Sequence, residues 1–157
     1  MAAACCSVHM LRLLPAGSLG TRDTGRQDGG GRGDTFMDGG VDRAYAAFFG
    51  PAFERLVYDA VARRPDGFLP VGAAEIVPTG HARIPYVLLA PTMLMPEHVS
   101  ASHAYRALRA ALRVAARESK IEDLYCPGLA TGVGGVEPDD AAREMAAAYA
   151  DATRANA

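Results

Sequence analysis

Four glycines lie within eight residues in the segment 128–135, whose sequence is GLATGVGG. A short apolar run, 121–126, precedes this segment, and a helical pattern opening at 137–140 follows it. Glycine lets a ligand approach the main chain closely, and consecutive N–H groups can then surround an anion. The start of the following helix would add the positive end of its dipole. The segment therefore indicates either an anion-binding loop or an ordinary turn between a strand and a helix.

A second glycine pair, Gly39 and Gly40, is also followed at once by a helical pattern. Asp42 comes directly after this pair, and a carboxylate there could orient or activate a water molecule as a general base. An acid in the first turn of a helix is equally well explained by the helix dipole, which favours negative charge at that end. Residue types alone leave both interpretations open.

The amino-acid composition limits the classes of protein to which the chain can belong. Its 157 residues are 50% apolar and 22% charged, which is typical of one soluble globular domain. The net charge of -2 argues against nucleic acid as a partner. No apolar run is long enough to span a bilayer, so no membrane partner is expected. The three cysteines form no disulfide framework or zinc spacing, so we expect a cytoplasmic protein without metal or cofactor.

One helical segment carries a line of positive charge. The pattern that starts at Ser100 or Ser102, either of which could cap it, has apolar residues on one side and arginines on the other. The arginines are Arg106, Arg109, Arg113 and Arg117. A solvated helix face is the first interpretation of this line, and a docking surface for a polyanion is the alternative.

The order of elements predicts an α/β fold. Helical patterns cover 41–64, 100–119 and 139–152, with an interruption at Gly50 and Pro51. Short runs rich in Val, Ile, Leu and Tyr cover 71–77, 84–90 and 121–126. Strands that alternate with helices in this way are typical of a sandwich with a mostly parallel sheet.

The N-terminal part of the chain has a different character. Residues 15–35 are rich in glycine, with scattered charges and no periodicity, and predict a mobile linker. Residues 7–14 could form one strand. We therefore expect 1–35 to be a flexible or divergent segment that the fold does not need, and 36–157 to be the folded domain.

Taken together, these segments resemble the macro domain, the ADP-ribose-binding module. The resemblance follows the family's order over about residues 36–152, in the segments 36–42, 70–80, 85–91 and 129–135. It implies a three-layer α/β/α sandwich with a mixed, mostly parallel sheet. The family carries an asparagine-bearing strand before its first glycine loop, whereas residues 31–35 here read GRGDT. The N-terminal strands are therefore missing or divergent by comparison with the family.

The resemblance also implies a ligand and the residues that hold it. The ligand would be ADP-ribose or a related nucleotide, free or attached to an ADP-ribosylated protein. Asp42 would be the catalytic residue of a hydrolase that removes ADP-ribose, and Appr-1-p processing is a related activity. The ligand-binding residues would be Gly39, Gly40, Val41, Gly128, Ala130, Thr131, Gly132, Val133, Gly134 and Gly135. Three alternatives stay open at this point: a binding module, a hydrolase that uses Asp42, and an inactive truncated fragment.

Overall fold

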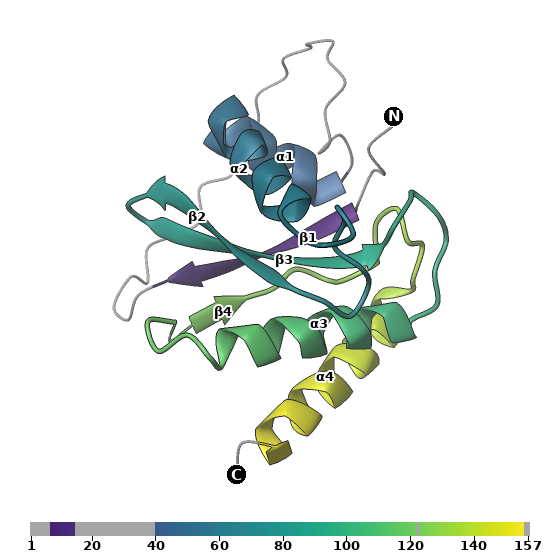
Figure 1. Ribbon diagram of the computed structural model, residues 1–157. Helices are drawn as coiled ribbons and strands as arrows, with labels where there is room; N and C mark the ends of the chain where they lie inside the picture. Colours follow the sequence, from purple (N-terminus) through teal and green to yellow (C-terminus); the bar gives the residue numbers. More distant parts are fainter. Residues whose placement is uncertain (1–6, 15–39, 122, 156–157) are drawn as a thin grey trace.

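The computed structural model describes residues 7–14, 40–121 and 123–155, with only the backbone described for 7–14 and 40–43. Four strands and four helices occur in these ranges (Figure 1). In chain order they are β1 (Ser7–Leu14), α1 (Gly40–Phe49), α2 (Pro51–Ala62), β2 (Glu75–His81), β3 (Ile84–Met93), α3 (Ser102–Ala115), β4 (Asp123–Tyr125) and α4 (Pro138–Ala155).

The four strands form one sheet in the order β2-β3-β1-β4. All three strand pairs are antiparallel, so the prediction of a mixed, mostly parallel sheet is wrong for the described strands. Only Ala82 and Arg83 separate β2 from β3, and so short a connection can join only antiparallel neighbours. β3 and β4 nevertheless run in the same direction, because each is antiparallel to β1, which lies between them.

β1 occupies an interior position in the sheet. Its residues pair with β3 on one side, for example Leu11 with Leu88, and with β4 on the other, for example Leu13 with Leu124. The expectation that residues 1–35 stand outside the fold therefore does not hold for residues 7–14. The predicted linker, 15–35, lies outside the described residues.

Helices pack on both faces of the sheet (Figure 1). Successive side chains of β3 point to opposite faces, as the geometry of a strand requires. Val87 and Leu89 lie in a buried cluster with residues of α2, whereas Leu88 and Ala90 lie in a second cluster with residues of α3. The α4 helix lies against α3. The apolar core is thus divided into two parts by the nearly fully buried β3.

Local sequence signals explain most helix boundaries. Gly50 adopts a φ of 80° between α1 and α2, and Pro51 begins α2, as the predicted interruption requires. Neither predicted serine caps α3, however. The N-cap residue is Ala101, with no side-chain cap hydrogen bond, and the Ser100 and Ser102 hydroxyls lie 2.7 Å apart. The two serines therefore interact with each other.

Candidate functional site

The segment 128–135 lies at one edge of the sheet. Because β3 and β4 run in the same direction, the segments that follow them, 94–101 and 126–137, leave the sheet at the same edge (Figure 1). The two segments contact each other directly, since the Val99 N–H donates a hydrogen bond of 3.0 Å to the Gly134 carbonyl. The fold therefore supports the glycine-rich segment with a second loop.

Hydrogen bonds within the segment fold it into consecutive turns. The Thr131 hydroxyl donates to the Gly128 carbonyl over 3.1 Å. The Gly135 N–H donates to the Gly132 carbonyl over 3.0 Å, and the Val136 N–H donates to the Ala130 carbonyl over 3.1 Å. The acceptors in these bonds are carbonyl groups of the segment, and the N–H groups of 131–134 take no part in them.

Four consecutive N–H groups lack a protein acceptor. Among the described residues, no hydrogen bond is accepted from the N–H of Thr131, Gly132, Val133 or Gly134. Of these residues, Gly132 and Val133 are exposed to solvent, Thr131 is half-buried and Gly134 is buried. A run of adjacent amide donors forms the concave anion-binding arrangement called a nest. The backbone of this segment can therefore accept a negatively charged group.

Two glycines in the segment are required by their packing. A side chain at Gly134 would bring its Cβ to 2.6 Å from the Ala130 carbonyl oxygen and to 3.0 Å from the Met93 methyl carbon. Gly135 has a φ of 64°, and a Cβ there would lie 2.4 Å from Nδ1 of His98. These contacts come from buried backbone and from the adjacent loop, so both glycines set the shape of the segment.

The predicted ligand-binding residues of this segment fall into two groups. Ala130 and Gly134 are buried, and Ala130 adopts a φ of 60°, which is uncommon for a residue with a side chain. Gly128, Gly132, Val133 and Gly135 are exposed, and Thr131 is half-buried. The first group packs the loop onto the protein, and the second group forms its outer surface.

The residues predicted around the first glycine pair are only partly described. Gly39 lies outside the described residues. Gly40, Val41 and Asp42 form the first turn of α1, and the side chains of Val41 and Asp42 also lie outside the described part. The α1 helix lies against β1, the strand next to β3 and β4.

The N-terminus of α4 differs from the expected anion site. Asp139 and Asp140 lie in its first turn, and Asp140 forms an ion pair with Arg143. These carboxylates already stabilise the positive end of the helix dipole, and they repel a second anion. The donors that could hold an anion are thus the N–H groups of 131–134.

Three large apolar residues near the segment take different positions. Met93, at the end of β3, is buried and faces Gly134. Leu94 and Met95 are 38% and 64% exposed. The first member of this apolar run thus packs in the core, and the other two are exposed beside the loop.

Sequence reasoning missed the contribution of the 94–101 loop. His98 places its ring against Gly135, and Val99 bonds Gly134. His103 lies further along, where its Nδ1 is 2.6 Å from the Thr92 carbonyl oxygen. No spacing or motif in the sequence indicates these contacts, because they depend on the common direction of β3 and β4.

An apolar cavity of about 520 Å³ lies elsewhere, between α3, α4 and β4. Its lining includes Leu108, Leu112, Leu124 and Cys126 but no residue of 128–135. Burial raises the pKa of the Cys126 thiol to about 12, so this group stays protonated near neutral pH. This lining does not offer the adjacent N–H donors that a pyrophosphate needs.

Among residues 44–121 and 123–155, whose side chains are described, no three His, Cys, Asp or Glu residues are grouped so that they could hold a metal ion. None of the helices described in these ranges has the length and apolar character needed to cross a membrane.

In many α/β folds ligands bind beside the carboxyl ends of strands, and the exposed glycine-rich segment follows one such end, that of β4. A family model for the macro domain matches residues 33–145. The chain therefore belongs to the macro domain family, whose members share a general ADP-ribose-binding module.

Two relatives show similarity to about 70% of the chain. An uncharacterized protein from Aquifex aeolicus (strain VF5) is 38% identical over 110 residues, which are 69% of this chain and 62% of the relative. An uncharacterized protein from Aeropyrum pernix is 35% identical over 113 residues, which are 71% of this chain and 56% of the relative. The chain thus matches about three fifths of the length of these relatives.

Proposed function

We propose that this protein binds ADP-ribose, with a phosphate of the ligand held by the N–H groups of residues 131–134. The observation that carries the proposal is the run of four consecutive donors without a described acceptor. Such donors suit a phosphate, because charged acceptors form stronger hydrogen bonds than neutral ones. Membership of the macro domain family supports ADP-ribose as the source of that phosphate.

The rest of the ligand would extend from this loop toward α1. In the proposal, Gly39, Gly40 and Val41 surround the distal ribose, where larger side chains would collide with the sugar. The exposed surface of Gly128, Thr131, Gly132, Val133 and Gly135 faces the ligand, while the buried Ala130 and Gly134 maintain the shape of the loop. The proposal also includes a three-layer α/β/α sandwich as the fold and the cytoplasm as the location of the protein.

Calorimetric titration of the full chain with ADP-ribose tests the proposal. We expect one bound ligand per chain, with an affinity at least about tenfold higher than that for AMP, which lacks the second phosphate and the distal ribose. A thermal melt followed by circular dichroism accompanies the titration. A cooperative melt without any heat of binding would reject the function, and the absence of a cooperative melt would favour the inactive-fragment alternative.

Hydrolysis of ADP-ribose linkages is the alternative function, and it depends on Asp42. This residue is the third residue of α1, where a carboxylate also stabilises the helix by its interaction with the dipole. Binding by backbone donors needs no carboxylate, because an acid near the pyrophosphate repels it. We therefore propose binding as the main function, and Appr-1-p processing and de-ADP-ribosylation as activities to be tested.

The Asp42→Asn variant separates binding from hydrolysis. We expect its affinity for ADP-ribose to stay within about twofold of the wild-type value, because Asn keeps the size of the side chain and removes only its charge. Release of ADP-ribose from a modified protein should equal the no-enzyme control for both proteins. Measurable wild-type release that falls by about two orders of magnitude in the variant would instead identify Asp42 as a general base.

A further inference from the structure

Arg106, Arg109, Arg113 and Arg117 form a continuous line on α3 and the turn after it, which we call the arginine stripe. All four residues are exposed. Their spacing of three, four and four residues places them on one side of the helix. Between residues 106 and 120 the chain has five basic residues and one acid, Glu118, although its net charge is -2. The overall charge thus conceals a local concentration of positive charge.

No carboxylate neutralises this charge in the described part of the chain. The ion pairs there join Arg64 to Glu75, Arg143 to Asp140 and Arg154 to Asp151, and none includes the arginine stripe. Two members are held by neutral groups instead. Arg106 donates a hydrogen bond of 3.0 Å to the Val71 carbonyl, and the guanidinium of Arg109 lies 6.0 Å from the centre of the Tyr105 ring. These contacts restrain the side chains and preserve their charge.

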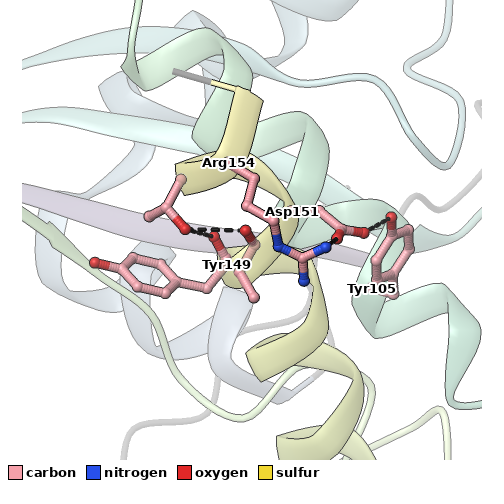
Figure 2. A network of polar contacts seen from close by, with 6 residues as sticks. Tyr105, Tyr149, Asp151 and Arg154 are labelled. Carbon is pink, nitrogen blue, oxygen red and sulfur yellow. Dashed lines mark hydrogen bonds and ion pairs between the residues drawn. The ribbon is translucent and has the colours of Figure 1, made fainter. Parts of the chain in front are cut away.

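The arginine stripe borders a groove of about 320 Å³ between α3 and the last turns of α4. Arg109 and Arg113 line it from α3, Arg117 lines it from the turn after α3, and Asp151 and Ala155 line it from α4. The Tyr105 hydroxyl donates a hydrogen bond of 2.7 Å to Asp151, which links the two helices (Figure 2). This hydrogen bond is also the main cause of a raised Tyr105 pKa.

Asp151, the acidic residue that lines the groove, already has two partners. Besides the bond from Tyr105, Asp151 forms an ion pair of 3.4 Å with Arg154, which Figure 2 shows on the same helix. Its negative charge is therefore shared with a cation of α4. The arginines of α3 keep their donors for a ligand from outside.

We propose that this groove binds the phosphate backbone of single-stranded nucleic acid without preference for its base sequence. Arg109, Arg113 and Arg117 cover about 12 Å along the helix axis, at intervals of roughly one turn. Guanidinium groups in such a row can contact successive phosphates, and each can form two hydrogen bonds to one phosphate. A positively charged groove that follows the backbone is one of the features of proteins that bind single strands without sequence preference.

The proposed nucleic-acid surface is separate from the glycine-rich segment. That segment leaves the sheet at the end of β4, whereas the groove lies beside the C-terminal half of α3, near the start of β4 (Figure 1). The proposal does not depend on the binding of ADP-ribose. An oligonucleotide and ADP-ribose should therefore bind at the same time.

Fluorescence anisotropy of a labelled oligouridylate of about 12 nucleotides tests the proposal. We expect the full chain to bind it at about 50 mM salt, with log affinity falling against log salt with a slope of about −2 if three phosphates are contacted. Replacing all three arginines (Arg109→Gln, Arg113→Gln, Arg117→Gln) should lower the affinity at least about tenfold and flatten this slope. The matching Lys triple variant should keep most of the affinity.

A control variant removes the same charge from other surfaces. Arg55, Arg83 and Arg143 are exposed on α2, on the turn between β2 and β3, and on α4, so their replacement by Gln should change affinity by less than about twofold. Melting curves should show that both Gln triple variants fold. The proposal is overturned if wild type does not bind, if the control loses as much affinity, or if ADP-ribose displaces the oligonucleotide. Binding to anionic lipid vesicles but not to the oligonucleotide would also overturn it.

Discussion

At the scale of single residues, glycines of the 128–135 segment have different roles. The φ of Gly134 is not in the left-handed region, and a side chain there would point toward Ala130 and Met93. Gly135 has the positive φ instead. A Cβ at Gly132 would meet no atom within 4 Å. Gly134 is therefore required by the packing of the loop, whereas Gly132 borders open space.

The Gly134→Val variant should lose stability. A valine cannot fit at 2.6 Å from the Ala130 carbonyl oxygen without movement of the loop backbone, and such overpacking costs about 1–3 kcal/mol of unfolding free energy. We expect the melting temperature to fall by about 3–10 °C, measured by circular dichroism. An unchanged melting temperature would show that the loop has a different conformation in solution.

At the scale of elements, β1 is the strand on which the sheet depends. It joins β3 to β4, and without it the two strands would have no hydrogen-bonded neighbour in common. Its sequence, SVHMLRLL, supports a strand, but the glycine-rich stretch that follows it suggested that the whole N-terminal region was dispensable. A strand is stabilised mainly by its neighbours in the sheet, and these are distant in sequence.

Replacing Leu13 with proline tests the position of β1. Leu13 pairs with Tyr86 on one side and with Leu124 on the other, so the lost N–H removes a ladder hydrogen bond on whichever side it faces. We expect a loss of at least about 2 kcal/mol and a fall in melting temperature of at least about 5 °C. A melting curve identical to that of wild type would mean that residues 7–14 do not pair in the sheet.

The sequence predicted the elements more accurately than their arrangement. The breaks at Gly50 and Pro51, the helical patterns of α2, α3 and α4 and the apolar run of β3 are local signals, and the structure contains the corresponding elements. Strand direction is not local. The alternation of helices and strands favoured parallel pairing, whereas the short β2–β3 connection and the insertion of β1 between β3 and β4 make every described pair antiparallel.

At the scale of the whole molecule, the resemblance to the macro domain family is confirmed by the match over residues 33–145. The segment 128–135 could be selected as a candidate from the sequence because its glycines, 128, 132, 134 and 135, form a visible pattern, and its role in binding stays a prediction. The support from His98 and Val99 was not predictable, because it arises only when β3 and β4 end at the same edge. The grouping of Arg109, Arg113 and Arg117 beside α4 likewise requires the packing of two helices.

The affinity of the Gly132→Val variant for ADP-ribose, measured by calorimetry beside wild type, tests the central claim most directly. A Cβ at this position meets no protein atom within 4 Å, so the variant should melt within a few degrees of wild type. Its side chain would add bulk to the exposed outer surface of the loop beside the N–H groups of 131–134, and we expect the affinity to fall at least about tenfold. Wild-type binding together with an unchanged affinity in the folded variant would contradict the account, because the phosphate would then be held elsewhere.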